Sequence, residues 1–132
     1  YFSTFQRMLA PDGRAVVQSI TIDDRLFPRY RRGTDFIQQH IFPGGMLPSP
    51  SEFRRQAAKA GLSIRDVFAF GVDYSRTLAE WSDSFEQHWP VIEAQGFDER
   101  FRRLWAFYLA YCQAGFNSAC TDVMQFELAH RS

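Results

Sequence analysis

The residues best placed for chemistry lie at positions 68–74, where an apolar strand pattern gives way to a helical one. Asp73 is predicted to cap this helix, because its short side chain can accept from the first unpaired backbone N–H groups. Tyr74 then falls in the first helical turn, beside the carboxyl end of a strand, where ligands bind in open α/β sheets. A phenol there is a candidate site residue, and the alternative is a half-buried core tyrosine.

A second candidate interrupts the buried strand predicted for residues 15–22. Gln18 and Ser19 are polar within an otherwise apolar, β-branched run. A buried amide without a hydrogen bond costs on the order of 1–3 kcal/mol. Gln18 is therefore expected either to satisfy neighbouring backbone groups or to face a polar ligand.

The elements that must position these residues can be read from the hydrophobic periodicity. A helix over residues 2–9, a Pro-Asp-Gly turn and the strand over 15–22 form the second half of a crossover unit, which suggests a parallel sheet. A second strand is predicted at 62–70, and a final strand at 120–129 could insert antiparallel into the sheet. Shorter helices are predicted over 35–42, with Thr34 or Asp35 as the cap, and from Ser49, which can act as the cap, to about Ala60.

A long helical hairpin separates the second and final strands. Its first arm follows Tyr74 and is kinked or restarted at Pro90, which cannot donate to the carbonyl four residues back. Its second arm runs from Asp98 to about Gly115 and carries an aromatic stripe. Such a stripe is typical of a core.

Composition restricts the function classes. Fifteen basic residues balance fifteen acidic ones, so no overall field favours nucleic acid, although four arginines fall within residues 25–32. The two cysteines lack the spacing of a zinc or redox site, and no metal is expected. No stretch is long and apolar enough to span a bilayer, and the simplest expectation is a reduced, cytoplasmic protein.

Several strings together resemble the cyclopropane-fatty-acyl-phospholipid synthases, a family that includes the mycolic acid cyclopropane synthases. They are residues 41–49 (IFPGGMLPS), 70–74 (FGVDY), 101–105 (FRRLW), 108–112 (YLAYC) and 115–116 (GF). The resemblance implies the C-terminal half of a class I S-adenosylmethionine-dependent methyltransferase fold, which is Rossmann-like, with about three strands and a long helical hairpin. It implies methylene transfer to the cis double bond of an unsaturated phospholipid acyl chain, at the inner face of the membrane.

The resemblance also implies roles for individual residues. Tyr74 matches a tyrosine that helps to hold a bicarbonate ion, the base for ring closure, and Ile20 matches a position whose backbone contacts that ion. Gln18 stands where studied members carry histidine; it can donate a hydrogen bond but cannot titrate. The expected wall for the acyl chain lies within residues 36–47 and includes Phe36, Ile37, Phe42 and Leu47.

By the same resemblance, residues 1–132 are expected to be the C-terminal part of a methyltransferase domain. The cofactor-binding half should precede Tyr1, so the fragment should be inactive alone and should self-associate through its open sheet edge and apolar face. Two alternatives stay open. One is a C-methyltransferase that makes methyl-branched lipids, and the other is a non-catalytic acyl-binding or oligomerisation module.

Overall fold

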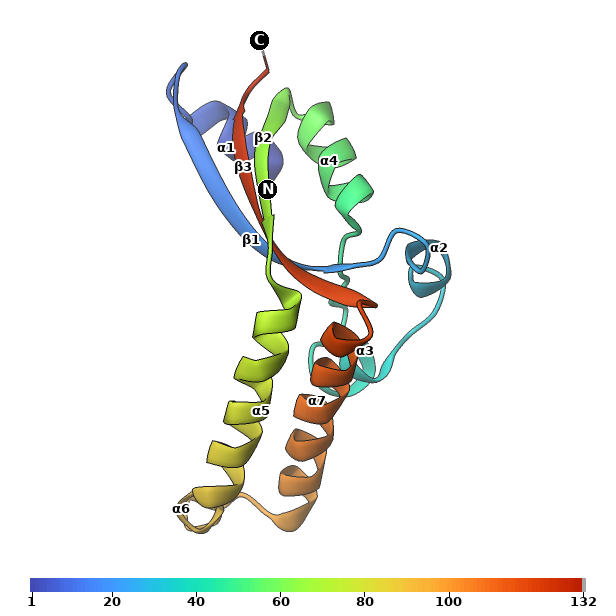
Figure 1. Ribbon diagram of the computed structural model, residues 1–132, viewed down its shortest axis with the longest axis vertical. Coiled ribbons are helices and arrows are strands. Elements are labelled where there is room, and N and C mark those ends of the chain that lie inside the picture. Colours follow the sequence, from blue (N-terminus) through green and yellow to red (C-terminus); the bar gives the residue numbers. More distant parts are fainter. Residues whose placement is uncertain (132) are drawn as a thin grey trace.

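The computed structural model describes residues 1–131, which form a small sheet with helices packed against it and a helical hairpin that extends from one end (Figure 1). The three strands are β1 (Arg14–Ile22), β2 (Leu62–Ala69) and β3 (Thr121–His130). The helices are α1 (Phe2–Met8), α2 (Phe27–Tyr30), α3 (Phe36–His40), α4 (Pro50–Lys59), α5 (Gly71–Gln87), α6 (Trp89–Glu93) and α7 (Glu99–Asn117).

The strand order is β1-β3-β2, with β3 antiparallel to both neighbours. β1 and β2 therefore run in the same direction, but the predicted parallel pairing is not observed among the described strands, because β3 lies between them. The predicted antiparallel insertion of the final strand is confirmed. Since β1 and β2 both end beside the first residues of β3, the two carboxyl ends lie on one rim of the sheet.

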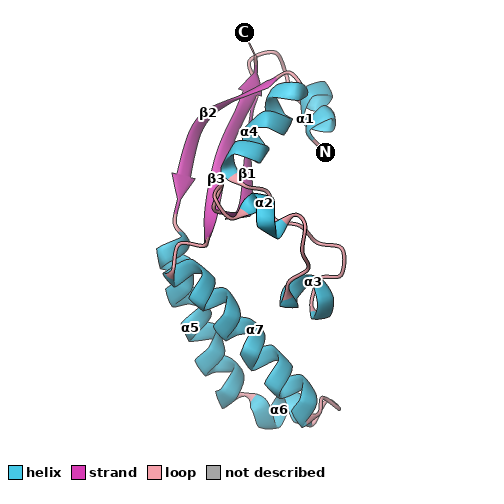
Figure 2. Cartoon of the chain, turned by 90° about the vertical axis from the view of Figure 1, so that its right-hand side faces the viewer, coloured by secondary structure: helices cyan, strands magenta, loops and turns pink. Residues whose placement is uncertain are grey.

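One face of the sheet is covered by α1 and α4 (Figure 2). Phe53 of α4 stacks on Phe126 of β3 with ring centroids 3.9 Å apart, and Ala57 is fully buried beside them. Ser49 caps α4 by accepting from the Glu52 N–H, as predicted. This buried cluster fixes β3 in the middle of the sheet.

The opposite face of β1 is open. Val16 is 64% exposed and Ile20 is 38% exposed, whereas Val17 and Thr21 point into the core. The prediction of a fully buried strand is therefore wrong for Val16, Gln18 and Ile20, because α1 and α4 cover only the other face of the sheet. On this face, the cluster formed with α5 and α7 contains Val123 of β3, and Ile22 at the end of β1 is buried. Gln18 lies on the open face, so its amide carries no burial cost.

The hairpin of α5 and α7 extends beyond the rim of the sheet (Figures 1 and 2). α5 ends at Gln87, and Pro90 stands in the first turn of a new helix, α6, as the restart prediction requires. Asp98 caps α7 by accepting from the Phe101 N–H. Within residues 1–131, no helix is long and apolar enough to cross a membrane.

Candidate functional site

Tyr74 lies where β2 passes into α5. The Phe70 N–H donates to the Val123 carbonyl at 2.9 Å, and the Tyr74 N–H donates to the Phe70 carbonyl at 3.0 Å, which closes the first turn of the helix. The Tyr74 ring is half-buried and makes edge-on contacts with Phe116 of α7 and Trp81 of α5, at centroid distances of 5.4 and 5.9 Å. The ring is thus held by the hairpin, while no hydrogen bond to its hydroxyl is found among residues 1–131.

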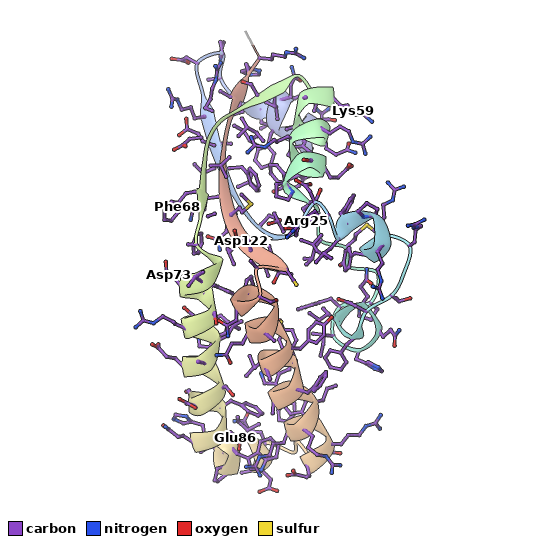
Figure 3. All side chains as sticks on the ribbon, turned by 45° about the vertical axis from the view of Figure 1, so that its right-hand side comes forward. Arg25, Lys59, Phe68, Asp73, Glu86 and Asp122 are labelled. Carbon is purple, nitrogen blue, oxygen red and sulfur yellow. The ribbon has the colours of Figure 1, made fainter. Side chains whose placement is uncertain are left out.

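The N-terminus of α5 is capped from β3 and not by Asp73. The helix begins at Gly71, so Asp73 is already its third residue, exposed and pointing outward (Figure 3). Asp122 Oδ1 accepts from the Gly71 N–H at 2.7 Å and from the Val123 N–H at 2.8 Å. A carboxylate at a helix N-terminus also interacts favourably with the helix dipole. The prediction of an Asp73 cap is therefore wrong, because the helix begins two residues earlier and its first N–H group, that of Gly71, donates to Asp122, 51 positions further along the chain.

A second polar contact holds the same turn of α5 against α7. Ser75 is buried, and its hydroxyl donates to Asn117 Oδ1 at 2.6 Å. Together with the Asp122 contact, this hydrogen bond fixes the backbone on both sides of Tyr74. These two contacts consequently hold the first turn of α5, which carries Tyr74, in a fixed position.

Gln18 and Ile20 occupy the open face of β1. Gln18 lies opposite Gln125 in the sheet register, and Gln125 Nε2 donates to Gln18 Oε1 at 3.0 Å. The first alternative for Gln18, a hydrogen bond to neighbouring backbone groups, is therefore not observed. Its amide oxygen is occupied by a side-chain partner, which leaves its NH2 group available as a donor.

The structure places Ile20 nearer than Gln18 to Tyr74 along the rim. Ile20 lies opposite Val123, and Val123 belongs to the buried cluster on which the Tyr74 ring packs. Gln18 and Ile20 thus lie on the same face of the sheet as Val123, and the Tyr74 ring packs on the cluster that contains Val123. No hydrogen bond joins Tyr74 to Gln18 or Ile20 in the part of the chain described.

Two further polar side chains of α7 pack on the cluster around Tyr74. Tyr108 and Cys112 both contact the cluster formed by Leu78, Leu109, Phe116 and Val123. Burial raises the pKa of Tyr108 from its ordinary value of 10.0 to about 12 and the pKa of Cys112 from 9.0 to about 11. Both groups therefore stay protonated at neutral pH and can act as hydrogen-bond donors. The helical spacing of the sequence predicts that both residues lie on the apolar stripe of this helix, but it does not indicate that they are neighbours of Tyr74.

The raised pKa of Cys112 predicts slow alkylation. At pH 8 a thiol with a pKa of about 11 is on the order of 100-fold less ionised than a thiol with the ordinary value of 9.0, and the thiolate is the reacting species. Iodoacetamide labelling followed by peptide mass spectrometry should show Cys112 reacting at least that much more slowly than in urea-unfolded protein. Labelling of the folded protein at the unfolded rate would contradict the burial of this thiol.

The four predicted acyl-wall residues are distributed along the segment from α3 to α4. Phe36 contacts Phe107 of α7 at a centroid distance of 4.7 Å, and Phe42, which is 57% exposed, contacts Tyr108 at 6.4 Å. Ile37 is half-buried in α3. Leu47 lies towards α2, since its N–H donates to the Tyr30 hydroxyl at 3.1 Å. Phe42 is thus the member linked to the Tyr74 cluster, through Tyr108.

The start of this segment is well defined by the sequence. Asp35 caps α3 by accepting from the Gln38 N–H at 2.8 Å, and the Gln38 side chain accepts from the Asp35 N–H at 3.0 Å. This reciprocal pair confirms one of the two predicted caps. α3 ends at His40, two residues before the predicted end, because the chain turns at Pro43-Gly44-Gly45.

Comparison with known sequences identifies relatives along most of the chain. The sequence model of the family described as mycolic acid cyclopropane synthetase matches residues 1–126. The tuberculostearic acid methyltransferase UfaA1 of Mycobacterium tuberculosis is 36% identical over 129 residues, covering 97% of this chain and 30% of that protein. The cyclopropane-fatty-acyl-phospholipid synthase of Escherichia coli K12 is 32% identical over 128 residues, covering 95% of this chain and 31% of that protein.

Solved structures show the same likeness in three dimensions. The cyclopropane synthase MmaA2 of Mycobacterium tuberculosis superimposes with a TM-score of 0.84 at 27% identity, covering 97% of this chain and 48% of that one. The mycolic acid cyclopropane synthase CmaA1, complexed with SAH and CTAB, also gives 0.84, at 29% identity and with 96% and 47% coverage. The chain spans about a third of the length of these two curated relatives and about half of these two solved structures. These superpositions confirm the predicted fold class.

Proposed function

The chain belongs to the mycolic acid cyclopropane synthetase family, and we propose that the intact protein alkylates the cis double bond of an unsaturated phospholipid acyl chain. S-adenosylmethionine supplies the methyl group, and the first candidate product is a cyclopropane fatty acid. The proposal extends to the intact protein because this chain spans only part of its relatives. The observation that carries it is the rigid presentation of Tyr74 at the carboxyl rim of the sheet.

The rim offers donors for a small anion. The Tyr74 hydroxyl and the Gln18 NH2 group lack partners within residues 1–131, and both can donate. We propose that these groups, with the backbone of Ile20, hold a bicarbonate ion. An anion held there would stabilise positive charge that develops on the acyl chain and would accept the proton that is lost. None of these residues is assigned to the methyl donor.

The acyl chain is proposed to lie against the segment of Phe36, Ile37, Phe42 and Leu47. Phe36 and Phe42 are the two that contact the aromatic face of α7, and Phe42 reaches Tyr108 beside the Tyr74 cluster. An acyl chain along this wall would bring its double bond towards Tyr74. Such a substrate also implies that the protein works in peripheral contact with a membrane surface.

A second candidate product is a methyl-branched chain, and Gln18 is the observation that favours it. A glutamine cannot take up a proton, and here its oxygen is already bonded to Gln125. Loss of a proton from the transferred methyl group closes the ring, whereas loss from a neighbouring carbon leaves a branched alkene. A saturated branch additionally requires hydride from a separate reductant. The name of UfaA1, a tuberculostearic acid methyltransferase, makes this outcome chemically relevant.

Product analysis decides between these candidates. Lipids from cells that express the intact protein should gain one CH2 per modified chain, as seen by mass spectrometry. Proton NMR then separates the isomers, because only a cyclopropane gives the high-field ring methylene signal. A saturated methyl branch would appear two hydrogens heavier. Lipids without any added carbon would contradict the proposed activity and favour a non-catalytic acyl-binding module.

Replacing Gln18 by histidine provides a further test. If Gln18 limits proton removal, Gln18→His should raise the ring-to-branch ratio or the ring-closing rate several-fold, because a base within reach of the anion contributes to proton transfer. The exposed position of Gln18 accommodates the ring without repacking. Gln125→Ala is the matched control, since it removes the partner of Gln18 without adding a base. An unchanged product ratio in Gln18→His would remove Gln18 from the site.

A further inference from the structure

A cluster of arginines on and around α2 takes no part in the candidate site. Arg29, Arg31 and Arg32 are exposed, and none of them pairs with a carboxylate in the described chain. By contrast, Asp23 holds Arg25 through two hydrogen bonds of 2.9 and 3.0 Å, close to the sheet (Figure 3). Residues 26–34 contain no acidic side chain. This stretch therefore carries three uncompensated positive charges in a chain whose net charge is zero.

Exposed apolar side chains accompany these charges. Leu26, at the start of α2, is 38% exposed, and Met46 is 54% exposed. Met46 is held near α2 because the neighbouring Leu47 N–H donates to the Tyr30 hydroxyl. We call Leu26, Arg29, Arg31, Arg32 and Met46 the α2 patch. Figure 1 shows α2 at the outer side of the molecule, away from the sheet.

We infer that the α2 patch docks on the surface of an anionic phospholipid bilayer. Guanidinium groups pair with lipid phosphates, and apolar side chains among them enter the boundary between headgroups and acyl chains. A purely acidic protein surface would satisfy the arginines but would leave Leu26 and Met46 uncovered. The inference rests on the proposed function, in which the substrate chain resides in such a bilayer.

The position of the patch connects it to the site. The segment that follows α2 runs through Phe36 and Phe42, which contact α7, and returns at Leu47 to Tyr30. One end of the proposed acyl wall therefore lies at the α2 patch, and Phe42 lies beside Tyr108. Docking through the patch would place the wall next to the membrane from which an acyl chain is drawn.

Vesicle co-sedimentation of the intact protein tests the inference. The vesicles contain equal parts of phosphatidylglycerol and phosphatidylcholine, or phosphatidylcholine alone. The double variant Arg29→Gln/Arg31→Gln should bind the anionic vesicles roughly 30-fold more weakly, since each basic residue near such a surface contributes about fivefold in affinity. Met46→Gln should weaken binding as well. Arg32 is left unchanged because its Nε donates to the Pro28 carbonyl.

The matched control is Arg100→Gln/Arg103→Gln, which removes the same charge from exposed positions on α7. Equal weakening by both double variants would overturn the inference, since it would indicate net charge rather than a docking surface. Unchanged vesicle binding in the Arg29/Arg31 variant, with lost binding to polyglutamate, would assign the patch to an acidic protein and also overturn it.

Turnover of a detergent-dispersed acyl substrate separates this inference from the proposed function. The Arg29/Arg31 variant should keep wild-type turnover there while it loses vesicle binding. Patch-dependent vesicle binding without any alkylation would support the docking surface and contradict the proposed activity. Alkylation together with vesicle binding that does not depend on the α2 patch would support the proposed activity and overturn the docking surface.

Discussion

Gly71→Ala is expected to lower the free energy of unfolding by about 3 kcal/mol, because a methyl group there collides with the side chain that caps α5. A Cβ atom built on Gly71 would lie 2.5 Å from Asp122 Oδ1 and 3.0 Å from Asp122 Cα. The carboxylate cannot move away without giving up the Gly71 and Val123 N–H groups that it accepts from. Urea unfolding of the intact protein, followed by circular dichroism, measures the change.

Gly33→Ala is the matched control for this prediction. A Cβ atom on Gly33 would meet the Arg29 carbonyl at 3.7 Å, which is ordinary van der Waals contact. The same substitution there should change stability by less than about 0.5 kcal/mol. Equal effects at the two glycines would show that loss of chain flexibility, rather than the contact with Asp122, determines the result.

Tyr74→Phe is expected to reduce turnover roughly 100-fold, as loss of one donor to a catalytic anion typically does. The ring contacts with Phe116 and Trp81 would be retained. Since the hydroxyl has no partner within residues 1–131, stability should change by less than about 0.5 kcal/mol. The measurements are the initial rate of methyl transfer at saturating lipid and the midpoint of unfolding. A lower rate with an unchanged midpoint indicates a lost hydrogen-bond donor and not a damaged fold.

Tyr111→Phe removes a phenol from the neighbouring helix and serves as the control. Its hydroxyl lies 3.5 Å from Asp35 Oδ2, at a partly exposed position outside the Tyr74 cluster. Turnover in this variant should stay within about twofold of the wild type. If Tyr74→Phe behaves like Tyr111→Phe, Tyr74 is a packing residue and the proposed anion site is wrong.

The sequence predicted most of the local structure, because local rules determine it. The caps at Asp35 and Ser49, the restart at Pro90 and the helical hairpin all depend on residues within a few positions of one another. Strand β1 was predicted within one residue of its observed bounds. The sequence also predicts correctly that Tyr74 lies in the first turn of the helix that follows β2.

Contacts between distant residues were the ones that the sequence could not supply. Nothing near Gly71 indicates that Asp122 caps its helix, and Asp73 satisfies the local rule without being used. The exposure of Gln18 was missed for a related reason. A β-branched run looks the same whether helices cover one face of a sheet or both, so only the packing of α1 and α4 decides it.

The strand order also determines how the chain can fold. β3 is the central strand, but it leaves the ribosome after both of its neighbours, 99 and 52 residues behind the last residues of β1 and β2. Until it arrives, β1 and β2 have no partner among the described strands, and their backbone groups stay open to wrong pairings. Folding of the sheet must therefore wait for contacts of high sequence separation, which form slowly. Because Asp122 belongs to β3, the N-terminus of α5 can be capped only when β3 has joined the sheet.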